Sequence, residues 1–298
     1  MPVKPSPEDD LVDAAEVFAR VRPRLFGIAY RVLGSASDAE DIVQDAWLRW
    51  QNYDRSSVQD PAAFLATTTT RLAINLAQSA RARRETYIGP WLPEPVDTSA
   101  DPTLGAERGE ALGYAVLLLL EKLPPTERAA YVLREAFDYP YPQIAEIVQV
   151  SEANARQLVS RARKHLAAER PAAPVDPVEQ RRLLDTFIAA AQSGDLTTLE
   201  GLFAADVVSY SDGGGVVRAS RIPVQGRETV AKFIHAFADR FWVGATVRPI
   251  EVNGQPAVSV VRDGTVVAVT TITLVADRID QILWIMNPEK LARIPVGL

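Results

Sequence analysis

Apolar residues recur along the first part of the chain at intervals of three and four, a spacing that places them on one face of an α-helix. This pattern continues to about Ala168 and predicts a helical N-terminal part. The predicted helices are Leu11–Val21, Arg22–Leu33, Ser37–Trp50, Asp60–Arg84, Gly105–Lys122, Pro125–Phe137, Pro142–Val148 and Ser151–Ala168.

After Val175 the pattern changes. Two helices and a third further on are followed by segments in which apolar and polar residues alternate, which is typical of half-buried strands. Asp263-Gly264 separates two such segments and predicts a tight hairpin. The predicted helices are Pro177–Ser193, Leu196–Phe203 and Arg227–Phe241, and the predicted strands are Thr246–Val252, Ala257–Arg262, Thr265–Val275 and Ile279–Ile285.

Two proline-rich stretches, Ile88–Pro102 and Pro171–Pro177, interrupt these patterns and mark boundaries. They predict a multidomain chain: a helical part, a linker, a second helical part, a second linker and an α+β part. The length of 298 residues agrees with about two domains or three small ones.

The amino-acid composition excludes several kinds of functional site. The chain has no cysteine, which excludes disulfides, a thiolate nucleophile and a cysteine zinc site. No signal-like apolar core stands at the start, and no segment approaches the roughly 20 apolar residues of a membrane span, so we expect a cytoplasmic protein with no membrane contact. The net charge of -6 does not exclude nucleic acid, because local placement of charge decides binding.

Ser151–Leu166 is a basic helix with a serine at its N-cap position. It follows the short helix Pro142–Val148 closely, an arrangement typical of a helix-turn-helix whose second helix enters a DNA groove. A solvated basic helix of an αα-hairpin is the alternative. The apolar face holds Ala155, Leu158, Val159, Ala162 and Leu166, and the opposite face holds Arg156, Gln157, Ser160, Arg161, Arg163 and Lys164.

An acidic helix covers the segment DAEDIVQDAWLRW, residues 38–50. Ser37 and Glu40 fit a capping box at its start, and Trp47 and Trp50 can anchor it. The pattern indicates either a recognition surface for a partner protein or an acidic surface helix over buried tryptophans. The residues that share its acidic face are Asp41, Gln44, Asp45 and Leu48.

A third segment, Pro61–Arg84, carries four consecutive threonines and ends in several arginines. Cations near a helix C-terminus complement the helix dipole, which accounts for the late arginines. The dipole does not account for four threonines, which are poor helix formers but offer hydroxyl groups to phosphates or bases.

Together these segments resemble an extracytoplasmic-function sigma factor of bacterial RNA polymerase. DAEDIVQDAW is similar to the region-two helix that docks on the β′ clamp helices, residues 64–85 to the helix that reads the −10 element, and residues 124–167 to region four, which reads the −35 element. The resemblance implies two partners, core RNA polymerase (β′ clamp helices and β flap) and promoter DNA, and a chain that is monomeric when free.

Carried over position by position, the resemblance implies three sets of contacts. Where the group commonly has asparagine this chain has Arg71. Arginine and glutamine can pair with guanine and adenine edges, respectively. The implied contacts are Asp41, Gln44, Asp45 and Leu48 with the polymerase; Thr67, Thr68, Thr70, Arg71, Asn75, Arg81, Arg83 and Arg84 with −10 DNA; and Arg156, Gln157, Ser160, Arg161, Arg163 and Lys164 with −35 DNA.

The part after region four resembles a SnoaL-like domain, an α+β fold in which a curved sheet and helices form a cone. Three short segments, YIGPWLPEP (Tyr87–Pro95), DGGG (Asp212–Gly215) and NPEKL (Asn287–Leu291), resemble signatures of the sigma subgroup that carries this domain. The expected domains are region two at 11–86, a linker at 87–107, region four at 108–170 and the SnoaL-like domain at 176–298.

This C-terminal extension could be an enzyme, because cyclases and isomerases of the fold it resembles need an acid/base pair in their pocket for catalysis. His235, Asp212 and Glu251 are the candidates. A helix histidine is more often structural, and the three glycines after Asp212 indicate a loop shaped for close approach rather than a catalytic mount. Val216-Val217 suggest a strand, which argues against a phosphate-binding loop. We therefore expect no enzyme, cofactor or metal site.

Prolines at 90, 93 and 95 favour an extended linker that presents apolar residues to a partner surface. We expect this linker to dock on the C-terminal domain and so regulate the sigma domains in cis. A flexible tether with an unrelated appendage, a ligand-binding pocket, and a helix-turn-helix regulator that acts without polymerase are the alternatives. The docking residues expected are Trp91, Leu92, Pro93, Asp212, Gly213, Gly214, Gly215, Asn287, Pro288, Lys290 and Leu291.

Overall fold

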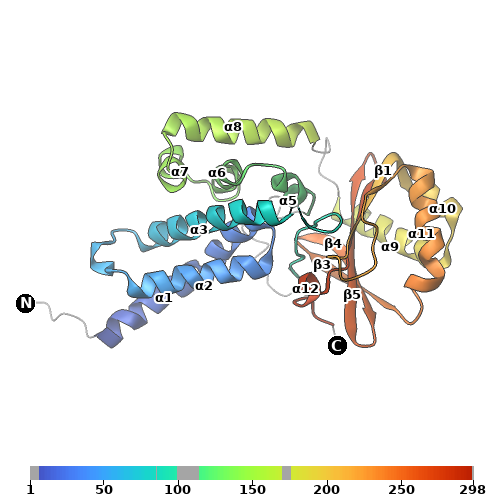
Figure 1. Cartoon of the computed structure of the whole chain (residues 1–298), viewed down its shortest axis with the longest axis horizontal. Helices are drawn as coiled ribbons and strands as arrows, with labels where there is room; N and C mark the ends of the chain where they lie inside the picture. Colours follow the sequence, from blue (N-terminus) through green and yellow to red (C-terminus); the bar gives the residue numbers. More distant parts are fainter. Residues whose placement is uncertain (1–6, 85, 99–113, 170–175, 297–298) are drawn as a thin grey trace, which may run out of the picture. The chain divides into compact units, whose positions relative to one another are not determined.

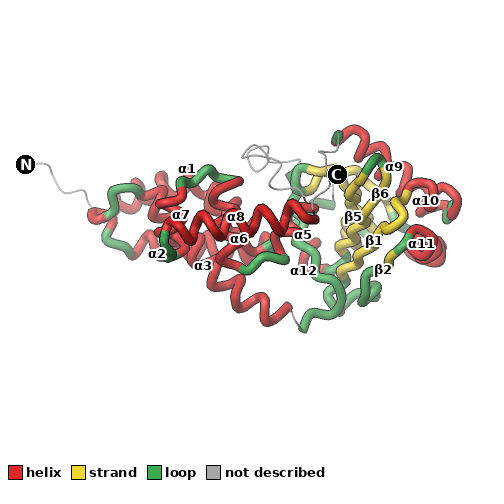
Figure 2. Tube along the Cα trace, turned by 90° about the horizontal axis from the view of Figure 1, so that it is seen from above, coloured by secondary structure: helices red, strands yellow, loops and turns green. Residues whose placement is uncertain are grey.

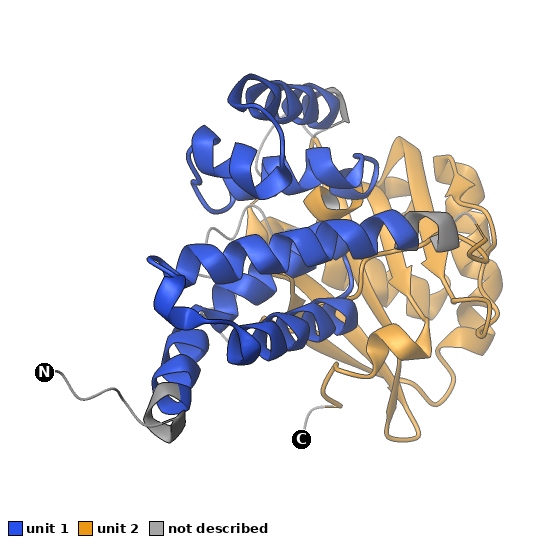
Figure 3. Ribbon diagram, turned by 60° about the vertical axis from the view of Figure 1, so that its left-hand side comes forward, with its two compact units in different colours: residues 1–82, 106–111, 119–168 blue, residues 83–105, 112–118, 169–298 orange. Residues whose placement is uncertain are grey.

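The computed structural model describes residues 7–84, 86–98, 114–169 and 176–296. The chain divides into two compact units (Figure 3), the first formed by residues 1–82, 106–111 and 119–168 and the second by residues 83–105, 112–118 and 169–298. The expected start of the helix Gly105–Lys122 and most of the boundary Pro171–Pro177 lie outside the described residues.

The described part of the first unit is helical, as its apolar spacing predicts. Its elements (Figure 1) are α1 (Pro7–Leu33), α2 (Ala36–Asn52), the 3-10 turn η1 (Arg55–Ser57), α3 (Pro61–Arg84), α6 (Pro125–Glu135), α7 (Tyr141–Val148) and α8 (Glu152–Glu169); α5 (Tyr114–Glu121) is shared between the two units.

Two helix starts in this unit differ from the prediction. A single helix, α1, replaces the two expected around Arg22, and Pro23 lies inside it. A proline costs a helix one hydrogen bond, but the turns after it are held by the buried residues Leu25 and Ile28. The N-cap of α2 is Ser35 rather than Ser37, because the Ser35 hydroxyl accepts the Asp38 amide at 3.1 Å.

The helix-turn-helix is confirmed. The Ser151 hydroxyl accepts the Asn154 amide at 3.2 Å, as an N-cap serine should. Between the two helices, Gln149 adopts the left-handed conformation (φ 58°), and its amide closes the end of α7 on the Ala145 and Glu146 carbonyls. Ala155 and Val159 are fully buried on the inner face of α8.

The second unit is built on a six-stranded sheet with the order β2-β1-β6-β5-β4-β3, in which β1 and β6 are parallel and the other pairs antiparallel. Its strands are β1 (Phe203–Asp212), β2 (Val224–Gln225), β3 (Thr246–Val252), β4 (Gln255–Arg262), β5 (Thr265–Val275) and β6 (Arg278–Ile285), and its helices are α9 (Pro177–Ser193), α10 (Leu196–Leu202), α11 (Arg227–Phe241) and α12 (Pro288–Leu291).

Each face of this sheet has its own apolar core. Ile282 and Trp284 of β6 join the cluster formed with α9, α10 and α11, which lie along one side of the sheet (Figure 2). Leu283 and Ile285 alternate with them and therefore point to the opposite face, where they join Leu92 of the linker. The linker is thus part of the core on that face.

Most of the sheet agrees with the prediction, and the hairpin at Asp263-Gly264 is confirmed by positive φ values at both residues. Two strands, β1 and β2, were not predicted. The expected strand at Val216-Val217 is wrong, because these residues lie in a turn after the glycines. β1 has no clear alternation of its own, and its pairing with β6 places it in the sheet.

Candidate nucleic-acid interface and linker-binding site

The acidic face of α2 is open. Asp41, Gln44, Asp45 and Leu48 are all exposed. On the inner side, Trp50 is buried and its indole N–H donates to the Ala14 carbonyl at 3.2 Å. The tryptophan therefore fixes the helix against α1 while its outer face stays available to a partner.

Helix α3 divides its four threonines between two environments. Thr67 and Thr68 are half-buried and line a pocket, whereas Thr69 and Thr70 are fully buried. The Thr70 hydroxyl donates to the Ala66 carbonyl at 2.7 Å. The expectation of a DNA contact at Thr70 is wrong in this structure, because its hydroxyl is buried and already bonded inside the helix.

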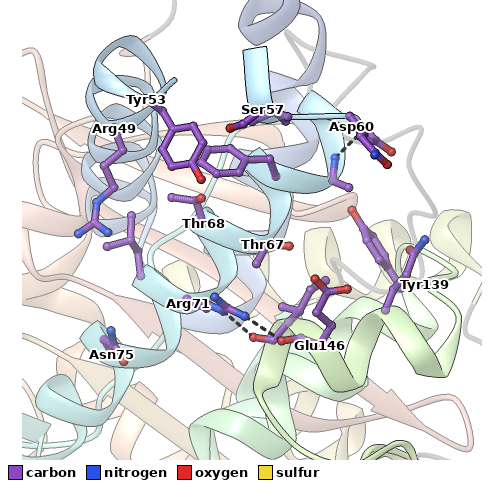
Figure 4. Close-up of a pocket in the computed structure, with 17 residues that line it drawn as sticks. Arg49, Tyr53, Ser57, Asp60, Thr67, Thr68, Arg71, Asn75, Tyr139 and Glu146 are labelled. Atoms are coloured by element: carbon purple, nitrogen blue, oxygen red, sulfur yellow. Dashed lines mark hydrogen bonds between the residues drawn. The ribbon is translucent and has the colours of Figure 1, made fainter. Parts of the chain in front are cut away.

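The pocket beside α3 has a volume of about 610 Å³ (Figure 4). Thr67, Thr68, Arg71 and Asn75 contribute to one wall, and α7 contributes Glu146 from another side. The guanidinium of Arg71 donates to the Ile147 carbonyl at 3.1 Å and to the Glu146 carbonyl at 2.9 Å. Four of the predicted −10 residues, Thr67, Thr68, Arg71 and Asn75, therefore line a pocket shared with the helix-turn-helix within this unit. The side chains of Arg81, Arg83 and Arg84, in the last turn of α3, lie outside the described part.

The outer face of α8 is exposed at every position expected to contact DNA, and its arginines are oriented by acidic neighbours. Arg156 pairs with Glu152 at 2.5 Å, and Arg161 pairs with the buried Glu127 at 3.0 Å. The hydrogen bond that Arg163 donates to the Glu135 carboxylate raises the pKa of Arg163 above its usual value. The remaining expected contacts on this face are Gln157, Ser160 and Lys164, all exposed.

The second unit contains a polar site centred on Asp212, whose side chain is fully buried at the end of β1. One carboxylate oxygen accepts the Tyr87 hydroxyl at 2.5 Å and the Gly214 amide at 3.1 Å. The other accepts the Leu92 amide at 2.8 Å and the Lys290 ammonium at 2.7 Å. A buried charge is tolerated only when it is paired and hydrogen-bonded, and much of this pairing comes from the linker.

Lys290 and Asn287 complete the site from α12. The Lys290 ammonium also donates to the Leu92 carbonyl and lies 4.1 Å from the centre of the Trp91 ring, where a cation–π attraction adds to the ion pair. The Asn287 amide donates to the Tyr87 hydroxyl at 3.1 Å. Burial and the hydrogen bond to Asp212 raise the pKa of Tyr87 above its ordinary value, so its proton is held in this network.

The glycines after Asp212 are required by close approach. Gly214 has φ +63°, and a Cβ on it would lie 2.5 Å from the Asn287 side chain. A Cβ on Gly213 would lie 2.4 Å from the Val217 carbonyl oxygen. Both observations agree with a loop shaped for contact.

Beyond Pro95 the linker continues the sheet. Thr98 donates its amide to the Glu251 carbonyl at 3.2 Å, and the Asn253 amide donates to the Val96 carbonyl at 2.9 Å, so residues 96–98 lie along the edge strand β3. The Asn253 side chain also accepts the Val96 amide at 3.0 Å. Sequence reasoning missed Asn253, whose only local signal is the turn it forms with Gly254.

The three residues considered for acid/base chemistry have structural contacts. Asp212 is the centre of the linker site, and the Glu251 carboxylate accepts the Thr98 hydroxyl at 2.9 Å. The His235 ring nitrogen Nδ1 lies 2.7 Å from the Gly194 carbonyl, at the end of α9. No helix among the described residues is long and apolar enough to cross a membrane.

The chain is similar to known sigma factors. The Sigma-70 region 2 family matches residues 17–84, and the Sigma-70, region 4 family matches residues 114–166. The ECF RNA polymerase sigma factor SigJ of Mycobacterium tuberculosis is 39% identical over 231 residues, covering 76% of this chain and 74% of SigJ. The probable ECF RNA polymerase sigma factor SigI of the same species is 32% identical over 275 residues, covering 91% and 92%.

A solved structure is similar over almost the whole chain. The crystal structure of the M. tuberculosis extracytoplasmic function sigma factor SigJ superposes with a TM-score of 0.77 at 33% identity, covering 95% of this chain and 99% of that one. The similarity therefore includes the sheet unit as well as the helical unit.

Proposed function

Because the chain belongs to the extracytoplasmic-function sigma factors, which bind core RNA polymerase and direct it to promoters, we propose that its SnoaL-like domain controls this activity in cis by holding the linker between the two sigma domains. The observation that carries the proposal is the buried carboxylate of Asp212. It accepts hydrogen bonds from Tyr87 and Leu92 of the linker.

Docking of the linker limits how far apart the two sigma domains can move. A free linker spans up to about 3.5 Å per residue and lets the two DNA-reading domains adopt the separation that polymerase and promoter require. Here the linker is held at Tyr87, at Leu92 and at residues 96–98. Holding it at three places shortens the part that is free to extend.

The remaining assignments follow the family. We propose that the exposed face of α2 docks on the β′ clamp helices, that Thr67, Thr68, Arg71 and Asn75 of α3 contact the −10 element, and that α8 reads the −35 element while region four meets the β flap. We also propose the domain limits 11–86, 87–107, 108–170 and 176–298, a monomeric free state and, since core polymerase is the partner, a cytoplasmic location. We propose no catalytic role, because the three acid/base candidates have structural partners.

Run-off transcription with core polymerase tests regulation in cis. Each of three changes should alter the initiation rate, because each releases the linker. They are Asp212→Asn in the full chain, Trp91→Ala in the full chain, and removal of residues 176–298. Asp206→Asn is the matched control, because Asp206 lies on the same strand and is exposed. Equal rates for the full chain, the variants and the truncated chain would contradict the proposal.

A further inference from the structure

Arg71 is the one predicted −10 residue on α3 that binds main-chain carbonyls of the helix-turn-helix in the described contacts. Its Nε donates to the Ile147 carbonyl at 3.1 Å and an Nη donates to the Glu146 carbonyl at 2.9 Å (Figure 4). These carbonyls belong to the last turn of α7, where a helix has no internal donors for its C=O groups.

The chemistry suits a charged donor. The C-terminus of a helix carries partial negative charge, which a cation stabilises, and the planar guanidinium can serve two neighbouring carbonyls at once. The Gln149 amide closes the Ala145 and Glu146 carbonyls, and Arg71 supplies the donor for Ile147. Arg71 therefore caps α7 from a different domain of the same unit.

We propose that Arg71 is a latch that holds the helix-turn-helix over the −10 face of α3 in the free protein and opens when promoter DNA and polymerase bind. While Arg71 caps α7, its Nε and one of its Nη groups are bonded to α7 carbonyls, so a DNA strand that binds these donors must displace them from the helix end. Closed and open arrangements of region two and region four therefore compete for a single side chain.

Other contacts between region two and region four also stabilise the closed state, so Arg71 adds to this stability and is not its sole source. The Arg128 guanidinium donates to the Val32 carbonyl at 2.7 Å, and Arg24 donates to the Phe137 carbonyl at 3.1 Å. Arg128 is buried, whereas Arg71 is only half-buried and lines the pocket. Arg71 is thus the contact that an incoming DNA strand can reach.

The latch itself rests on this geometry alone. Its consequence for promoter binding rests on the proposed assignment of α3 to the −10 element. The two can be tested separately, because the separation of α3 and α8 can be measured without DNA.

The chain has no cysteine, so the substitutions Gln78→Cys on α3 and Ala153→Cys on α8, both at exposed positions, create unique sites for spin labels in the full chain. We expect a single distance in the starting protein, measured by double electron–electron resonance. Arg71→Asn should add a population at longer distance, with the closed-to-open ratio lowered by about tenfold for two half-exposed charge-assisted hydrogen bonds.

Arg49→Asn is the matched control. Arg49 lines the same pocket and carries the same charge, but no hydrogen bond from it to α7 is present among the described contacts, so its substitution should leave the distances unchanged. Arg71→Lys should give an intermediate result, because an ammonium can replace the charge but not the two-pronged geometry. Identical distance distributions for Arg71→Asn and Arg49→Asn would overturn the latch.

If circular dichroism shows that Arg71→Asn does not fold, the Arg71→Lys variant tests the proposal instead. A distance distribution for Arg71→Lys that equals that of the starting protein would then overturn it. Adding core polymerase and a promoter fork carrying a −10 element to the labelled starting protein should then move it to the longer distance. If the longer distance appears in Arg71→Asn but not when the −10 strand binds the starting protein, the latch is supported and the assignment of α3 to the −10 element is wrong.

Discussion

Asp212 shows how much one residue can depend on its partners. Its position before three glycines was recognisable in the sequence, but its partners Tyr87, Leu92 and Lys290 lie far away along the chain. Transferring a carboxylate out of water costs several kcal/mol unless it is paired. The buried charge therefore stabilises the docked linker and penalises its release.

The ion pair gives the first prediction. Lys290→Met leaves the buried Asp212 without its cation and should destabilise the sheet unit by about 3 kcal/mol, the typical result of breaking a buried pair. Lys232→Met is the control, because Lys232 pairs with Glu228 on the surface, where solvent screens the pair, and its loss should leave stability nearly unchanged. Denaturant unfolding followed by tryptophan fluorescence measures both; equal losses would contradict this account.

The raised pKa of Tyr87 gives a prediction about pH. A group whose pKa is higher in the folded protein contributes stability below its unfolded pKa of about 10, and this contribution is lost as pH rises further. Tyr87→Phe should therefore be less stable than the starting protein at pH 8, and the difference should shrink above pH 10. Denaturant unfolding at a series of pH values checks this, and a difference that stays constant would contradict it.

At the scale of elements, local signals worked where the element is defined by its own residues. The helix-turn-helix has a serine N-cap, a buried apolar face and a tight turn, all of which are local. The errors fall where distant residues decide. Helix α1 continues through Pro23 because the turns after it are held by the buried residues Leu25 and Ile28, and β1 becomes a strand because β6 lies beside it.

The DGGG loop gives a prediction at this scale. Gly214→Ala should destabilise the sheet unit by about 2 kcal/mol or more, because the residue has a positive φ and its Cβ would collide with Asn287. Gly201→Ala is the control, since Gly201 lies in α10 with no atom within 4 Å of the added Cβ, and should stabilise by about 0.5 kcal/mol. Thermal unfolding distinguishes them; equal effects would show that the loop has room for a side chain.

At the scale of the whole molecule, the linker belongs to the core of the sheet unit. Leu92 is buried beside Leu283 and Leu291, and residues 96–98 run along β3. A segment that composition alone would describe as a tether is therefore a structural element. This follows from contacts made across more than half the length of the chain.

Limited proteolysis tests this view. We expect residues 87–98 to resist cleavage in the full chain and the Lys290→Met variant to be cut in this segment about tenfold faster for each 1.4 kcal/mol by which the docked state is weakened. Lys232→Met should be cut at the starting rate. Rapid cleavage of the unmodified linker would show that it is not held in solution.

Most of the helices, the helix-turn-helix, the Asp263-Gly264 hairpin and the family could be inferred from the sequence, because they depend on residues close together in the chain or on short motifs. The folded molecule was needed to show that β1 pairs in parallel with β6, that Thr70 is buried, that Arg71 caps α7, and that Asp212 joins the linker to Lys290. Parallel pairing, burial and buried ion pairs depend on which distant segments meet, and periodicity along the chain carries no record of that.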